Sequence, residues 1–141
     1  MKILILRGIP GCGKSTWAKT QRGAVIVSAD NFFMHDGEYK FDPTKIAHAH
    51  YDCFRKYLAA IRRKAPLIIV DNTNTSLWEI SPYVLAGESH GYTVEIHSFK
   101  CPVDVAVARN IHGVPPKSIQ AMYDHWEQPL PWWNETSHDT K

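Results

Sequence analysis

The 141-residue sequence has no long hydrophobic run. Its N-terminal apolar stretch, residues 3–6, ends at Arg7 and Gly8. This stretch is far shorter than the roughly 18 apolar residues of a membrane span, and it is too short for the hydrophobic region of a signal peptide. We therefore expect neither a membrane anchor nor a secretion signal. The sequence also lacks internal repeats and low-complexity segments, which leaves an ordinary globular protein.

Cysteine is scarce as well. Cys12, Cys53 and Cys101 are an odd number of thiols, and their spacing matches neither a disulfide framework nor a zinc site. This pattern favours reduced cysteines in a cytoplasmic protein over a secreted, disulfide-bonded one. The eight histidines add no set with zinc spacing, so we expect no structural metal.

Neither sign of charge predominates. Sixteen Lys and Arg residues oppose 14 Asp and Glu residues, and the net charge of +2 excludes a protein with a polybasic nucleic-acid-binding tail. The charge is uneven, however, because residues 119–141 carry four acids and one base, which leaves +5 on residues 1–118. We predict a domain over 1–126 and an acidic, Trp-rich tail over 127–141 that packs back on the domain or binds a partner protein.

Short apolar runs alternate with helical patterns along the chain. The predicted strands are 2–7, 24–28, 67–70 and 92–99. The predicted helices are 14–21, 43–64, one that begins at either Ser76 or Ser81 and ends at Gly91, 102–110 and 116–126. This alternation predicts an α/β fold with a parallel sheet of four or five strands. Ligands of such sheets bind beyond the carboxyl ends of the strands, which places the chemistry near Gly8, Asp30, Asp71 and Cys101.

The segment Gly8 to Ser15 has the P-loop pattern, a glycine and four residues before Gly-Lys-Ser, between a predicted strand and a predicted helix. Its glycines let successive N–H groups point at phosphate oxygens, and the helix N-terminus favours the same anion. Lys14 can reach the β- and γ-phosphates, and the Ser15 hydroxyl can bind Mg²⁺. We therefore predict ATP, or another NTP, with Mg²⁺. The predicted nucleotide-binding residues are Gly8, Gly11, Cys12, Gly13, Lys14, Ser15 and Thr16.

Asp30 comes two residues after the second predicted strand, at the end that lies beside the P-loop in a parallel sheet. A carboxylate at this place can accept the proton of a hydroxyl that attacks the γ-phosphate. The alternative is that Asp30 only caps the turn that follows it. Asp71 follows the core strand, where many NTPases carry a metal-binding acid. An ATPase is therefore an alternative to a kinase.

Four motifs in order suggest a family. Residues 6–18, 28–31 and 71–74, with Arg109-Asn110 before a Val-Pro loop, resemble polynucleotide 5′-hydroxyl kinases of the bacteriophage type. The motifs resemble even more the related small kinase domains found within certain ubiquitin-ligase-binding proteins. The resemblance covers residues 1–126 and implies ATP-dependent phosphorylation of the 5′-hydroxyl end of DNA or RNA.

The resemblance also implies roles for individual residues. Lys14 and Ser15 would hold ATP and Mg²⁺, and Asp30 would be the general base. Arg109, in a lid over about 109–116, would contact the transferring phosphate, a role that suits an arginine on chemical grounds as well. The alternative for Arg109 is a helix C-terminal cation that complements the helix dipole. The candidate acceptor-site residues are Asn72, Thr73, Phe33 and Asp71.

The sequence departs from the phage enzymes mainly on the acceptor side. Ala29 and Phe33 stand where those enzymes have arginines, and the lid reads Ile-His-Gly over 111–113 without their further arginine. The aspartate of their Asp-Thr-Asn motif aligns with Asn72, one place after Asp71. A kinase for a nucleoside, nucleotide or sugar therefore stays open, as does a nucleotide-binding adaptor without transferase activity.

Two further groups of residues could contact a nucleic acid. Four aromatic residues follow Asp30 and could stack on a base, although packing in a lid or core is the commoner role: Phe32, Phe33, Tyr39 and Phe41. The predicted helix 43–64 carries six basic residues against one acid, which is either a solvated face or a groove for phosphates.

Overall fold

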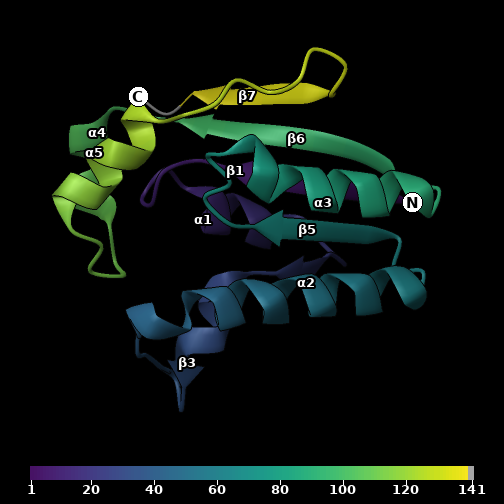
Figure 1. Ribbon diagram of the computed structural model, residues 1–141, viewed down its shortest axis with the longest axis horizontal. Coiled ribbons are helices and arrows are strands. Elements are labelled where there is room, and N and C mark those ends of the chain that lie inside the picture. Colours follow the sequence, from purple (N-terminus) through teal and green to yellow (C-terminus); the bar gives the residue numbers. More distant parts are fainter. Residues whose placement is uncertain (140–141) are drawn as a thin grey trace.

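The computed structural model describes residues 1–139. Its centre is a five-stranded parallel sheet in the order β2-β5-β1-β6-β7, which confirms the α/β prediction (Figure 1). The strands are β1 (Lys2–Arg7), β2 (Val25–Val27), β5 (Leu67–Asp71), β6 (Thr93–Lys100) and β7 (Glu135–Asp139). In the central register, Ile3 of β1 lies between Ile68 of β5 and Val94 of β6. All strands therefore end at one edge, where the candidate site residues were expected.

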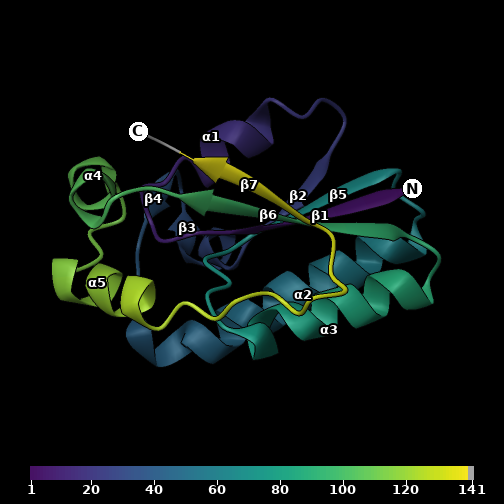
Figure 2. The ribbon, with the colours of Figure 1, turned by 90° about the horizontal axis from the view of Figure 1, so that it is seen from above.

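Helices cover both faces of this sheet. Figure 2 shows α2 (Ile46–Arg62) and α3 (Leu77–Ser89) on one side and α1 (Lys14–Lys19) on the other. The two short helices α4 (Val103–Arg109) and α5 (Pro116–Asp124) lie at the end to which the strands point. The side chains of β1 alternate between two hydrophobic cores. Ile3 and Ile5 belong to the core under α2 and α3, whereas Leu4 and Leu6 belong to the core with α1, α4 and α5.

Two short elements separate β2 from α2. The 3₁₀ helix η1 (Ala29–Phe33) follows β2 and leads into a hairpin of β3 (Met34–His35) and β4 (Glu38–Tyr39). A second 3₁₀ turn, η2 (Pro43–Lys45), precedes α2. The predicted cap at Asp42 is present, because its carboxylate accepts hydrogen bonds from the backbone and the hydroxyl of Thr44.

The start of α3 resolves one open alternative. The helix begins at Leu77, after Ser76, and Pro82 lies inside it. The Ser76 side chain, however, makes no capping hydrogen bond. Instead, the carboxylate of Glu127 accepts a hydrogen bond from the Leu77 N–H at 3.0 Å. A residue 50 positions away therefore caps this helix, which no local pattern could indicate.

The C-terminal segment completes the sheet. Of the predicted tail 127–141, the described part contains β7, which pairs with β6 in parallel. A fully buried Arg7 fixes the path to it, donating hydrogen bonds to the carbonyls of Asn74, Thr75 and Glu127. Its guanidinium also lies 3.8 Å from the centre of the Trp126 ring. Trp126 and Trp133 are therefore packed against the domain, whereas Trp132 is 76% exposed.

The cysteine expectation is wrong for two of the three thiols. Cys12 and Cys101 form a disulfide with their Cα atoms 5.7 Å apart, and only Cys53 is free and buried. The P-loop follows β1 and Cys101 follows β6, and these strands are neighbours in the sheet. The two residues are 89 positions apart, so their pairing has no signature in cysteine spacing. No helix within residues 1–139 has the length and apolar character that crossing a bilayer requires.

Candidate active site

The P-loop needs its glycines for packing as well as for conformation. Gly11 and Gly13 have φ values of +91° and +90°, in the region that favours glycine. A Cβ atom on Gly11 would lie 2.3 Å from the carbonyl oxygen of Ala106 in α4, and one on Gly8 would lie 2.7 Å from that of Phe99. The loop is therefore pressed against β6 and α4, the helix that carries Arg109.

Lys14 is buried inside this loop. Its ammonium donates hydrogen bonds to the carbonyls of Gly8 at 2.8 Å and Ile9 at 3.3 Å. Burial lowers the pKa of Lys14, and the carboxylates of Asp71 and Asp30 oppose that shift. Among residues 1–139, the amine thus has only backbone carbonyls as hydrogen-bond partners, which a phosphate could replace.

Ser15 and Asp71 form the second polar pair of the loop. The Ser15 hydroxyl donates to the Asp71 carboxylate at 2.7 Å. Burial raises the pKa of Asp71, whereas the Ser15 hydrogen bond and the nearby Lys14 lower it. A carboxylate and a hydroxyl are hard oxygen donors of the kind that Mg²⁺ prefers. The structure therefore places Asp71 beside Ser15 of the P-loop.

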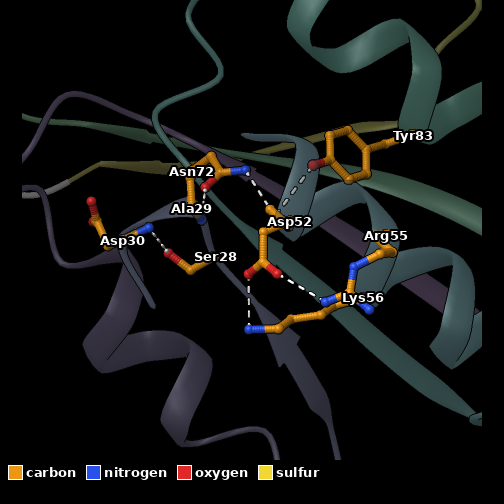
Figure 3. Close-up of polar contacts among 9 residues, drawn as sticks. Ser28, Ala29, Asp30, Asp52, Arg55, Lys56, Asn72 and Tyr83 are labelled. Carbon is orange, nitrogen blue, oxygen red and sulfur yellow. Dashed lines mark hydrogen bonds and ion pairs between the residues drawn. The ribbon is translucent and has the colours of Figure 1, made fainter. Parts of the chain in front are cut away.

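Asp30 lies in the first turn of η1, and its carboxylate is exposed. Ser28 caps this turn, because its hydroxyl accepts a hydrogen bond from the Asp30 N–H at 3.2 Å (Figure 3). Ser28, and not Asp30, therefore caps this turn. The Asp30 carboxylate instead accepts a hydrogen bond from the Tyr39 hydroxyl at 3.3 Å.

Asn72 fixes the loop that carries Asp30. Its amide oxygen accepts a hydrogen bond from the Ala29 N–H at 2.9 Å, and its amide nitrogen donates to the Cys53 sulfur at 3.5 Å (Figure 3). The hydroxyl of Tyr83 donates to the same sulfur. Both ends of the Asn72 amide are therefore engaged within the protein, although the side chain borders the cavity described below. The neighbouring Thr73 accepts the Gly8 N–H through its carbonyl and joins this segment to the P-loop.

Arg109 ends α4, and its side chain is exposed, with no ion pair to any residue in 1–139. Asn110 shapes the loop after it, since its amide donates to the Val114 carbonyl and accepts from the His112 N–H. The ring of His112 lies edge-on against Tyr39, with 4.3 Å between ring centres. The lid is thus in contact with the hairpin that follows Asp30.

One cavity of about 770 Å³ brings most of the predicted residues together. Lys14, Asp30, Asp71 and Arg109 all line it, as do the rest of the loop from Gly11 to Thr16, Asn72 and Thr73. Phe33 does not line it. That side chain is 4% exposed and packs in the core against Tyr39 and Phe41.

The cavity is also lined by residues that were not predicted as site residues from the sequence. Trp17, His112 and His138 line it. His138 belongs to β7, stacks on Phe99 with 4.3 Å between ring centres, and shares a 2.8 Å hydrogen bond with His97. Burial and the neighbouring His97 lower the pKa of His138. No local pattern marks His138, because only the pairing of β7 with β6 brings it to the site.

Comparison with known protein sequences shows the family of this chain. Residues 3–116 match AAA_33, a family described as an AAA domain. The chain belongs to this family. Human NEDD4-binding protein 2 is 37% identical in an alignment of 136 positions that covers 89% of this chain and 8% of that protein. The AAA_33 chain thus corresponds to a small part of this much longer relative.

Two solved structures share the P-loop kinase fold of this AAA_33 domain. A chain of the Pnkp1/Rnl/Hen1 RNA repair complex is 25% identical and superposes with a TM-score of 0.70, over 89% of this chain and 43% of its own. A sugar kinase from Janibacter sp. is 17% identical with a TM-score of 0.68, over 99% of this chain and 85% of its own. The second likeness concerns the fold alone.

Proposed function

We propose that this protein is an ATP- and Mg²⁺-dependent kinase that phosphorylates the 5′-hydroxyl end of a polynucleotide. The observation that carries the proposal is one cavity that holds a phosphate-binding loop, an exposed carboxylate and an exposed arginine: Lys14, Asp30 and Arg109. An adaptor that only binds nucleotide has no need of a carboxylate at this place.

The donor side would act through positioning and charge. Backbone N–H groups of the P-loop would bind the phosphates, and the Lys14 ammonium would exchange its two carbonyl partners for phosphate oxygens. Ser15 and Asp71 would hold Mg²⁺, which supplies charge neutralisation to the phosphates when bound. Arg109 would add a second positive charge at the transferring group.

The acceptor side would act through Asp30. The acceptor hydroxyl oxygen forms a bond to the γ-phosphorus, and the bond from that phosphorus to the β–γ bridging oxygen breaks, which releases ADP. The hydroxyl proton passes to the Asp30 carboxylate. Asn72 would hold the Asp30 loop in place through the Ala29 N–H rather than bind the acceptor, since its amide is already engaged.

The likeness to a chain of an RNA repair complex supports a nucleic-acid end as the acceptor. The net charge of +5 on residues 1–118 is compatible with such an acceptor. The basic residues of α2 contribute less free positive charge than their number indicates, because Arg55 and Lys56 both pair with Asp52, at 3.0 and 2.9 Å (Figure 3). Ala29 and Phe33, in place of the acceptor-binding arginines of the phage enzymes, favour a smaller acceptor, which makes a small-molecule kinase the second candidate.

Terminally labelled ATP tests both candidates in one experiment. The protein is incubated with 5′-hydroxyl DNA and RNA oligonucleotides and, separately, with nucleosides, nucleoside monophosphates and sugars. We expect label on the oligonucleotides, and D30N lowers this transfer about 100-fold or more while ATP binding is kept. D36N is the matched control, because Asp36 is an exposed hairpin residue whose left-handed φ of +52° an asparagine tolerates. Label only on small molecules would select the second candidate, and ATP binding without any transfer would select the adaptor.

A further inference from the structure

A short hairpin holds one tyrosine against the candidate base. Strands β3 and β4 are joined by Asp36 and Gly37, whose φ values of +52° and +79° suit a tight two-residue turn. A hairpin with two-residue strands has little stability of its own. It is anchored by aromatic packing, because the buried Phe33 contacts both Tyr39 and Phe41. The position of the Tyr39 side chain is therefore determined by the core.

Tyr39 joins the base to the lid. Within residues 1–139, its hydroxyl is the one side-chain hydrogen-bond partner of the Asp30 carboxylate, at 3.3 Å. Its ring meets the lid residue His112 edge-on, at an interplanar angle of 85°. Burial and the neighbouring Asp30 raise the pKa of Tyr39 to about 12, so the hydroxyl keeps its proton and donates it in a hydrogen bond at neutral pH.

The chemistry of this contact resembles the one that an acceptor would make. A hydroxyl donates to the Asp30 carboxylate in both cases, and in this structure that hydroxyl is the phenol of Tyr39. Asp30 is exposed, so without this contact its carboxylate could equally activate water. In that reaction a water oxygen bonds to the γ-phosphorus, ADP leaves, and Asp30 takes one water proton, which wastes ATP.

We infer that Tyr39 determines specificity for the acceptor over water, by occupying the acceptor-hydroxyl position on Asp30 until an acceptor displaces it. This role rests on the proposed kinase function. The contact with His112 adds a consequence, because a displaced Tyr39 ring leaves the loop that directly follows Arg109 and α4. Binding of the acceptor would thereby break the contact between Tyr39 and the lid residue His112.

The variant Y39F tests this inference, since it keeps the ring and its contacts with Phe33, Phe41 and His112 and removes only the hydroxyl. Two rates are measured with the same labelled ATP: hydrolysis without an acceptor, and transfer to a 5′-hydroxyl oligonucleotide. We expect hydrolysis to rise about tenfold and the acceptor KM to fall about tenfold, with kcat for transfer changed less than about threefold. A residue with a merely structural role would raise KM or lower kcat.

Controls separate this role from the proposed function. Y51F removes a hydroxyl from an exposed tyrosine of α2 and should change neither rate. The double variant D30N/Y39F should lose the added hydrolysis, because that reaction uses Asp30. Normal transfer with unchanged hydrolysis and acceptor KM in Y39F would overturn the role of Tyr39 and leave the kinase function standing. If the wild type transfers label to no acceptor, the kinase function fails, and the role of Tyr39 in choosing the acceptor over water fails with it. Phosphate found on Tyr39 itself by mass spectrometry would also overturn it.

Discussion

Packing of the P-loop against α4 predicts a large effect of G11A. Any side chain at this position must adopt a φ of +91°, which costs about 1–2 kcal/mol. The added Cβ would also lie 2.3 Å from the Ala106 carbonyl oxygen and 3.0 Å from the carbonyl carbon of the same residue. These are backbone atoms that no rotamer change can move, so α4 must shift, at a further cost of about 1–3 kcal/mol.

The matched control is G91A, which isolates the conformational cost. Gly91 has a similar φ of +82°, and its added Cβ would meet nothing within 4 Å. We expect G91A to lower the free energy of unfolding by about 1–2 kcal/mol and G11A by about 2–5 kcal/mol. For a domain of this size, each kcal/mol corresponds to about 3 °C in the thermal midpoint.

Thermal unfolding and ATP titration of G11A and G91A together test this packing. G91A should bind ATP as the wild type does, whereas G11A should bind at least about tenfold more weakly, because the loop and α4 have moved apart. Equal midpoints for the two variants, or unchanged ATP affinity in G11A, would refute the argument that the P-loop and α4 are packed as one unit.

Three further results are expected. The Cys12–Cys101 disulfide closes a long loop, so a reductant should lower the free energy of unfolding by about 2–4 kcal/mol, and equal denaturant midpoints with and without reductant would contradict this. N72A leaves the Ala29 N–H without its partner, which should cost about 1–3 kcal/mol and slow transfer more than it weakens ATP binding; unchanged stability would count against it. Because the folded-state pKa of Tyr39 is raised, its contribution to stability is complete below about pH 10 and is lost as the pH rises through about 12. A phenolate titration should show this ionisation in the wild type and lose it in Y39F, and a titration near pH 10 would be inconsistent with the hydrogen bond between Tyr39 and Asp30.

Local sequence patterns were sufficient to predict the centre of the fold. Residues 3–6 of β1 are apolar without alternation, as expected for a strand buried on both faces, and the P-loop follows the strand at once. The strand β7 had no such signal. Its residues Glu135–Asp139 are mostly exposed and polar, and it joins the sheet at the edge through backbone pairing with β6. Such pairing depends on the whole fold and leaves little trace in composition.

The same distinction applies to the site. Lys14, Ser15 and Asp30 stand in or directly after predicted elements, so their common location followed from parallel topology. The partners that set their geometry come from distant parts of the chain. Arg7 looked like the end of a strand, yet it is buried and binds carbonyls 67 to 120 positions away. Asn72 looked like an acceptor ligand, but its amide is taken up by Ala29 and a sulfur from α2.

The most direct test of the proposed kinase is a competition between two ends. Equal amounts of one oligonucleotide with a free 5′-hydroxyl and one with a 5′-phosphate are incubated with the protein, Mg²⁺ and terminally labelled ATP. We predict label only at the free 5′-hydroxyl, and transfer about 100-fold lower with D30N but unchanged with D36N. Equal labelling of both oligonucleotides, or full transfer by D30N, would contradict the assignment of Asp30 as the base for a 5′-hydroxyl acceptor.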